Sequence, residues 1–288
     1  MKGRQRATLA GFVAVMLWSL LALLTVQTRP VPPLQLTAMS FAIGAGIGAI
    51  WTWASGGFRQ LATVGWKVYA FGTAGLFGYH VLYFSALRLA PPAKAGLIAY
   101  LWPLLIVLFS GLLPGEHLRR VHVVGAGLGF AGAALIVTGG EAGFSRAFLP
   151  GYLLALACAF TWSGYSVLSR RMGQVPSAAV TVFCLATAVL SAGLHLALEQ
   201  TAWPVGPRGW GAVVALGIGP VGLAFYLWDT GMKRGDIQLL GVTTYAAPLL
   251  STLALVLAGL ARPGPVLFLA ASLISAGALL AAAPTWRR

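Results

Sequence analysis

Residues 128–135 read LGFAGAAL, and residues 273–280, 145 positions further on, read LISAGALL. The two octapeptides agree at five of their eight positions. The same offset aligns other residues in the middle of each half: Gly96 with Gly241, Tyr100 with Tyr245 and Pro103 with Pro248. The chain therefore contains two related halves, predicted as one domain over 1–140 and a second over 149–288.

Composition places both halves in a membrane. The charged fraction is 8% and the hydrophobic fraction 59%, with a mean hydropathy of +0.86, whereas a soluble domain has roughly 25% charged residues. The net charge of +14 would suit a nucleic-acid-binding protein. The basic residues, however, are spread over the short gaps between apolar runs, so we expect the lipid bilayer as partner and no nucleic acid.

The apolar runs have the length of membrane spans. About 20 apolar residues in a helix cross the roughly 30 Å hydrocarbon core. We predict an all-α integral membrane protein with ten transmembrane helices at 7–27, 33–54, 65–87, 92–112, 120–139, 149–169, 177–198, 209–231, 237–260 and 264–283. Five spans per half is an odd number, so the second half enters the membrane from the opposite side and the two five-helix repeats are inverted.

The basic residues also predict the orientation. With the N-terminus inside, 13 of the 19 Lys and Arg residues fall in inner segments and 6 in outer segments. Positive charge accumulates on the cytoplasmic side of membrane proteins. We therefore expect a multi-pass protein of the bacterial inner membrane with both termini in the cytoplasm.

Small residues recur at the spacing that lets membrane helices approach closely, as in Gly44-xxx-Gly48 and Gly125-xxx-Gly129. The spans at 120–139 and 264–283 are almost free of polar groups, which is typical of scaffold or contact helices. Packing inside one chain is the favoured interpretation, and dimerisation through one of these helices is the alternative. A monomer is the expected state.

Motifs for other chemistries are absent from the sequence. There is no GxxxxGK[ST] phosphate-binding loop, HExxH or CxxC motif, so we predict no ATP-driven transport, no catalytic residues, no metal site and no cofactor. Asp229 lies near the inner end of the eighth span. It is interpreted either as the partner of Lys233, four residues on, or as a proton-coupling group.

Polar and aromatic residues at mid-span are the candidate binding groups. His80 lies at membrane depth, where ionisable residues are costly and commonly functional, although a neutral histidine bonded between helices is the alternative. Pro103 and Pro248 are predicted to kink their spans and to act as hinges, because a mid-helix proline removes a backbone hydrogen bond. Interrupted helices at matching places in two repeats are typical of a transport site.

Several tryptophans and tyrosines also count out near the middle of their spans rather than at the interfaces. The predicted substrate-binding residues are Trp18, Tyr79, His80, Tyr83, Tyr100, Trp102, Trp162, Tyr165, Ser166 and Tyr245. Such an aromatic, charge-poor zone would bind a small amphipathic solute with an apolar or aromatic body. A strongly anionic solute would require Lys or Arg at the midplane.

The segment YFSALRLAPPAKAGLIAYLWPLL (83–105) and the following Glu116 resemble the EamA type of the drug/metabolite transporter superfamily. Ala261 stands where the second repeat would carry the matching acid. The resemblance implies two repeats of five helices with termini inside. Within the family, the chain is similar to bacterial exporters of aromatic and other hydrophobic amino acids, which implies alternating access through a central cavity as the repeats rock against each other.

The lack of an evident coupling residue favours facilitated diffusion or weak proton coupling. A broader drug or metabolite exporter of the same fold is the close alternative. A membrane enzyme or sensor is a more distant one.

Overall fold

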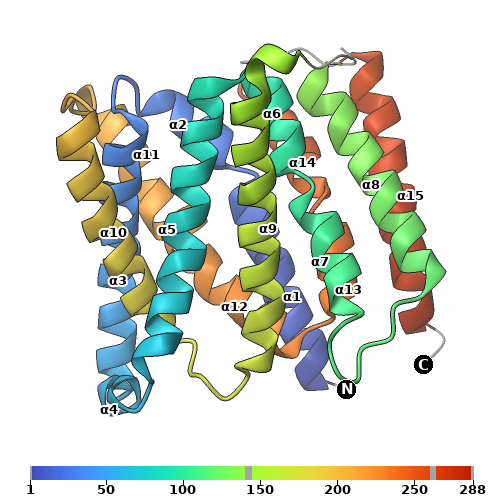
Figure 1. The fold of residues 1–288 in the computed structure, drawn as a ribbon, viewed down its shortest axis with the longest axis horizontal. Helices are drawn as coiled ribbons and strands as arrows, with labels where there is room; N and C mark the ends of the chain where they lie inside the picture. Colours follow the sequence, from blue (N-terminus) through green and yellow to red (C-terminus); the bar gives the residue numbers. More distant parts are fainter. Residues whose placement is uncertain (1, 140–144, 260–263, 287–288) are drawn as a thin grey trace.

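The computed structural model describes residues 2–139, 145–259 and 264–286. Within these ranges every regular element is a helix (Figure 1). The first half contains α1 (Lys2–Trp18), α2 (Leu21–Gln27), α3 (Pro33–Ala54), α4 (Phe58–Ala62), α5 (Trp66–Leu89), α6 (Pro92–Ala99), α7 (Trp102–Ser110) and α8 (Arg120–Thr138). The second half contains η1 (Arg146–Phe148), α9 (Leu149–Arg171), α10 (Ala179–Leu198), α11 (Gly206–Ile218), η2 (Gly219–Leu223), α12 (Ala224–Arg234), α13 (Ile237–Thr243), α14 (Ala246–Leu257) and α15 (Pro265–Trp286).

Eight helical stretches of the described chain are long and apolar enough to cross a membrane. They are Lys2–Gln27, Pro33–Ala54, Arg120–Thr138, Arg146–Arg171, Ala179–Leu198, Gly206–Arg234, Ile237–Leu257 and Pro265–Ala282. Exposed leucine, valine and tryptophan side chains cover their outer faces, as lipid contact requires. The chain is therefore an all-helical, multi-pass membrane protein.

Two further predicted spans fall outside these eight. α5 has 24 residues but carries tyrosine, histidine and glycine along its length, which lower its hydropathy. α6 and α7 together form a shorter apolar stretch, Lys94–Ser110, which is broken at Tyr100 and Leu101. Both carry predicted binding residues, Tyr79, His80 and Tyr83 on α5 and Tyr100 and Trp102 on the α6–α7 stretch.

Two spans predicted as continuous are interrupted. The span at 7–27 breaks between Trp18 and Leu21, where the Ser19 hydroxyl bonds the Met16 carbonyl at 2.6 Å. The span at 209–231 begins at Gly206 and contains the π-helical turn η2 around Pro220. Proline has no N–H to donate, so it loosens the helical ladder there and leaves carbonyls for other donors.

The predicted small-residue packing is confirmed. A side chain at Gly44 would come within 2.9 Å of the Gly222 backbone, and one at Gly125 within 2.6 Å of the Gly277 carbonyl. These contacts bring α3 against η2 and α8 against α15. The two scaffold helices thus pack on each other within one chain (Figure 1).

The long helices run between two ends of the molecule, which are the upper and lower ends in Figure 1. α1 begins and α15 ends at the lower end of Figure 1, whereas the α2–α3 and α5–α6 connections lie at the upper end. The two broken helices run in opposite senses, α6–α7 downward and α13–α14 upward. Their breaks, at Tyr100–Leu101 and Thr244–Tyr245, stand at matching places in the two halves.

Candidate functional site

A cavity of about 610 Å³ lies between the helices and reaches the upper end of the molecule. Its rim includes Arg29 and Val31 in the α2–α3 connection, and its deep part includes Trp18, Trp102 and Trp162. Small-molecule sites typically measure about 300–1,000 Å³. No acidic side chain of the described chain lines it, and Arg29 is the one basic residue among the lining residues.

Seven of the ten predicted binding residues line this cavity, namely Trp18, Tyr79, His80, Tyr83, Tyr100, Trp102 and Trp162. They come from α1, α5, the α6–α7 break, α7 and α9. Three others, Tyr165, Ser166 and Tyr245, are buried elsewhere in the core. The packing therefore divides the predicted residues into cavity wall and core, and their role in binding remains a prediction.

The deep end of the cavity is built from stacked and edge-on aromatic rings. Trp18 contacts Trp102 and Trp162 at ring-centroid distances of 6.2 and 5.9 Å, and Trp162 lies 5.7 Å from Phe225. The Trp18 indole N–H donates to the Pro220 carbonyl at 3.0 Å. The carbonyl of the π-helical turn thus holds the Trp18 ring in place across 202 residues of sequence.

The helix breaks are joined through Tyr245. Its hydroxyl accepts a hydrogen bond from the Leu104 backbone N–H at 2.9 Å, so α14 of one half closes the break of the other half. Tyr100, its counterpart in the first half, lines the cavity instead. Pro103 is the second residue of α7 and Pro248 the third of α14. Each proline follows a two-residue interruption whose backbone angles stay close to helical, which fits the predicted kink; the hinge role remains a prediction.

Ser166 and Tyr165 have structural partners. The Ser166 hydroxyl accepts from the Trp228 indole N–H at 3.1 Å, and the Tyr165 ring packs on Gly75 and lies 5.6 Å from Phe71. Trp228 is 1% exposed and stands behind the cavity wall, 5.0 Å from Trp18. This second layer of aromatic residues fixes the rings that face the cavity.

Sequence reasoning missed most of the other cavity residues, among them Phe41, Phe225 and Ser40. Phe41 of α3 lies edge-on to His80 at 5.0 Å and stacks on Phe225 of α12 at 5.4 Å. Ser40, next to Phe41, also lines the cavity. A phenylalanine or serine in an apolar span carries no local signal of a site, so only the assembled helices identify these positions.

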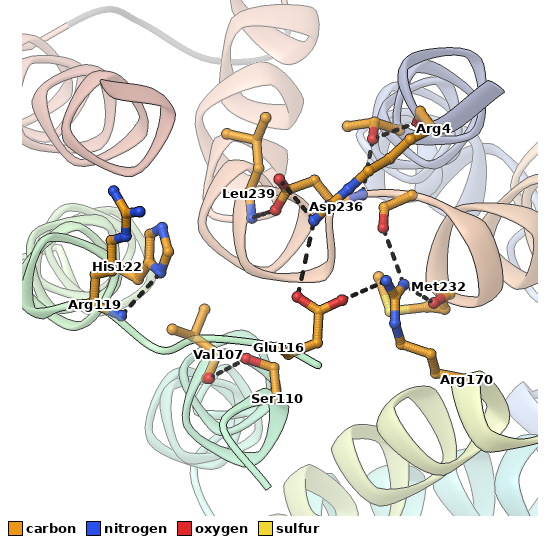
Figure 2. Close-up of polar contacts among 12 residues, drawn as sticks. Arg4, Val107, Ser110, Glu116, Arg119, His122, Arg170, Met232, Asp236 and Leu239 are labelled. Atoms are coloured by element: carbon orange, nitrogen blue, oxygen red, sulfur yellow. Dashed lines mark hydrogen bonds and ion pairs between the residues drawn. The ribbon is translucent and has the colours of Figure 1, made fainter. Parts of the chain in front are cut away.

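A cluster of ionic residues closes the lower end of the molecule, opposite the cavity mouth (Figure 2). Arg4 lies 3.2 Å from the Asp236 carboxylate and 3.8 Å from that of Glu116. Arg170 donates to Glu116 and, through its other terminal nitrogen, to the Met232 and Gly235 carbonyls at 2.8 and 3.0 Å. We call Arg4, Glu116, Arg170 and Asp236 the lower ion cluster.

Two of the three ion pairs of the lower ion cluster, Arg4–Asp236 and Arg170–Glu116, join the first half of the chain to the second. Glu116 follows α7, while Arg170 lies in the last turn of α9 and Asp236 precedes α13. The sequence linked Glu116 to the family signature, and the structure gives it partners. Ala261, its counterpart in the second half, lies outside the described residues.

Asp229 forms the ion pair with Lys233 that the i+4 spacing predicted, at 2.8 Å. The Ser177 hydroxyl donates to the same carboxylate oxygen at 2.6 Å, and Lys233 also donates to the Val175 carbonyl at 3.0 Å. Both charged side chains are almost fully buried. A buried carboxylate with these partners has a structural role in holding the α9–α10 connection to α12.

A second ionic group lies at the upper end, beside the cavity rim. Glu199 accepts from Arg88 at 2.8 Å, pairs with His195 at 3.0 Å, and accepts from the Leu34 and Gln35 backbone N–H groups at the start of α3. A carboxylate at a helix N-terminus satisfies otherwise unpaired donors. This upper cluster, Arg88, His195 and Glu199, joins α3, α5 and α10.

Both halves of the chain match the same family of known proteins. The EamA-like transporter family matches residues 5–138 and again residues 149–283. The chain belongs to the EamA-like transporter family. The two matched segments correspond to the two related halves, and the family is one of membrane transporters.

Curated relatives extend along nearly the whole chain. The aromatic amino acid exporter YddG of Ancylobacter novellus is 57% identical over 280 residues, covering 96% of this chain and 97% of the exporter. The protein of that name from Salmonella typhimurium is 28% identical and covers 99% of each chain. A solved crystal structure with 56% identity superimposes with a TM-score of 0.93, covering 98% of both chains.

Proposed function

We propose that this EamA-family chain exports aromatic and other hydrophobic neutral amino acids across the bacterial inner membrane. The observation that carries the proposal is the cavity, whose deep part is walled by Trp18, Trp102 and Trp162 and contains no carboxylate or ammonium of the described chain. Indole and phenyl rings stack favourably on such walls. The names of the relatives from Ancylobacter novellus and Salmonella typhimurium support this substrate class.

Transport occurs by alternating access. The cavity reaches one end of the molecule, and the lower ion cluster joins the two halves at the other. A solute bound in the cavity would leave at the upper end, and opening of the lower ion cluster would admit the next solute. With the N-terminus in the cytoplasm, as the basic residues favour, this direction is export.

The proposed architecture is ten spans in two inverted five-helix repeats, over 1–140 and 149–288. The eight apolar stretches together with α5 and α6–α7 make up the ten. The opposite senses of the two broken helices support the inversion. One chain supplies the whole cavity wall, so a monomer is the proposed functional unit.

The proposed mode of transport is facilitated diffusion, driven by the gradient of the amino acid itself. Asp229, the acidic residue considered for proton coupling, has Lys233 and Ser177 as partners within 2.8 Å. A coupling carboxylate would exchange its proton with a water-filled pathway, and none of the described acids lines the cavity. Gradients of the amino acid itself then drive its export.

The test is counterflow in liposomes that contain the purified protein and carry no ion gradient. Labelled tryptophan, phenylalanine, a cationic dye and a sugar are each supplied against the same unlabelled solute inside. Saturable exchange of the two amino acids alone supports the proposal. Movement of the dye alone would replace it with a broad drug exporter, and no movement with or without a proton gradient would favour a membrane enzyme or sensor.

A further inference from the structure

The cavity holds polar groups without protein partners, and these can identify what it binds. Ser40 is 2% exposed and lines the cavity, yet its hydroxyl has no hydrogen-bond partner among the described residues. Two other hydroxyls on the same wall are satisfied, since Thr37 donates to the Pro33 carbonyl and Thr28 to the Thr25 carbonyl. The Ser40 oxygen is itself fully buried, so this hydroxyl does not face the cavity space and is no contact for a solute.

His80 offers an acceptor. Its Nδ1 lies 2.7 Å from the Leu76 carbonyl oxygen, which can only accept, so Nδ1 carries the proton. A charged imidazole is costly among the rings of Phe41, Tyr79 and Phe225 that surround it. In the neutral ring the other nitrogen, Nε2, is an acceptor. The described chain provides it with no partner, and it is absent from the fully buried unpaired atoms, so it is accessible from the cavity.

Trp102 and Trp162 offer donors. An indole N–H can only donate, and the structure pairs this group in two neighbouring tryptophans, Trp18 with Pro220 and Trp228 with Ser166. The N–H groups of Trp102 and Trp162 have no acceptor in the described part of the chain. Their rings line the cavity 6.2 Å apart.

The acceptor and the donors lie one aromatic ring apart. Tyr79 is 5.2 Å from His80 and 5.3 Å from Trp162, and Phe225 is 6.4 Å from His80 and 5.7 Å from Trp162. The two ends of an α-amino acid head group, an ammonium and a carboxylate, are adjacent on one carbon. The His80 side and the tryptophan side of the cavity share these two neighbours, so each side can be assigned one end of a head group.

We propose that the cavity recognises the zwitterionic head group of its solute with uncharged groups. His80 Nε2 accepts from the ammonium, and the Trp102 and Trp162 N–H groups donate to the carboxylate. This inference rests on the proposed export function and makes it narrower: amines that lack the carboxylate and hydroxy acids that lack the ammonium bind weakly, although they carry the same aromatic ring.

Competition against labelled tryptophan in the counterflow assay tests this. The competitors are unlabelled tryptophan, tryptamine, which lacks the carboxylate, and indole-3-lactate, which has a hydroxyl in place of the ammonium. For the wild type we expect tryptophan to compete at least about tenfold more strongly than either analogue, as one lost hydrogen bond to a charged group predicts.

Variants assign each end of the head group. His80→Phe keeps an aromatic ring and removes the acceptor, so the preference for tryptophan over indole-3-lactate should fall about tenfold while the preference over tryptamine persists. Trp102→Phe should do the reverse. Ser40→Ala and Ser191→Ala, which each remove a fully buried, unpartnered hydroxyl, are matched controls and should leave tryptophan competition unchanged.

Each other outcome is decisive. If the wild type exchanges tryptophan but accepts all three competitors equally, head-group recognition is wrong and the export function stands. If the His80 and Trp102 variants weaken every competitor alike, these residues only shape the cavity and the proposal is overturned. If the wild type exchanges no tryptophan at all, the export function itself fails.

Discussion

Neutralising Glu116 should open the lower end of the molecule. In Glu116→Gln, the charge-assisted bond from Arg170 becomes a bond to a neutral amide, while the two carbonyl bonds of Arg170 are kept. The side chains of Arg170 and Glu116 are only 18% and 10% exposed, so solvent screens the pair little. Arg4, at 3.8 Å and 45% exposed, adds little to the effect.

The magnitude follows from the bond that is weakened. A hydrogen bond to a charged group contributes about 1.5–3 kcal/mol and a neutral one about 0.5–1.5 kcal/mol, so the substitution removes about 1–1.5 kcal/mol. The lower ion cluster exists in the state with the upper cavity open, so weakening it favours the opposite state. The fraction of molecules open at the lower end should therefore rise about 5- to 12-fold, as long as that state remains the minority.

The assay is labelling of a cysteine placed behind the cluster. Met232 is fully buried and its carbonyl accepts from Arg170, so Met232→Cys reports opening at this end. The native Cys158 and Cys184 are replaced by alanine, and a water-soluble maleimide is added from the side where α1 begins. The labelling rate should rise with the open fraction in Glu116→Gln.

A matched control removes a charge at the same end without breaking a pair. Arg234 is exposed, and no ion pair joins it to the described residues, so Arg234→Gln should label at the rate of the parent protein. Equal rates in the Glu116 and Arg234 variants, with both proteins folded, would refute the view that the cluster holds this end closed.

Three further substitutions separate the site from the scaffold. His80→Ala removes one local hydrogen bond. It should slow tryptophan exchange at least about tenfold with a stability loss of about 1 kcal/mol. A melting temperature and an exchange rate equal to those of the wild type would contradict this. Gly48→Val drives a methyl into a buried tyrosine hydroxyl of α12 and should cost about 1–3 kcal/mol, whereas Gly46→Val, with open space around it, should leave the melting temperature unchanged. Asp229→Asn orphans the buried Lys233, so we expect about 3–5 kcal/mol of destabilisation and an unaltered pH profile of exchange; a lost pH dependence would restore the coupling role.

Local sequence patterns predicted the helices because each depends on nearby residues. Runs of about 20 apolar residues placed the spans, and the prolines at 103 and 248 marked the two helices that break. The interruption after Trp18 and the π-helical turn at Pro220 were not predicted. They depend on each other, since the Trp18 indole bonds the Pro220 carbonyl from 202 residues away, and no window of the sequence contains both.

The binding zone was predicted by depth and residue type, which identify candidates but not their orientation. Tyr100 and Tyr245 occupy equivalent places in the two halves, yet Tyr100 lines the cavity and Tyr245 bonds the Leu104 backbone. The lower ion cluster was hidden for another reason. The basic residues between the apolar runs were interpreted only as signals of membrane orientation. The pairing between Glu116 and Arg170 was not predicted because it depends on how α7 and α9 meet. A usable signal was the scarcity of acids, 5 against 19 basic residues, which gives each carboxylate a choice of partners.

The packing of the helices also limits how the cavity can change sides. If the two sequence halves moved as rigid bodies, the long contacts of α3 with α10, α5 with α9, α1 with α12 and α8 with α15 would all have to slide, because each pair joins the halves. Tightly packed helices resist such sliding. The upper cluster lies inside one group of packed helices, α3, α5 and α10, so it can persist during transport. The lower ion cluster instead connects the segments after α7 and before α13 to α1 and α9. For the proposed alternating access, we therefore expect the moving bodies to be packed helix pairs drawn from both halves rather than the repeats themselves, with the lower ion cluster among the contacts that break between them.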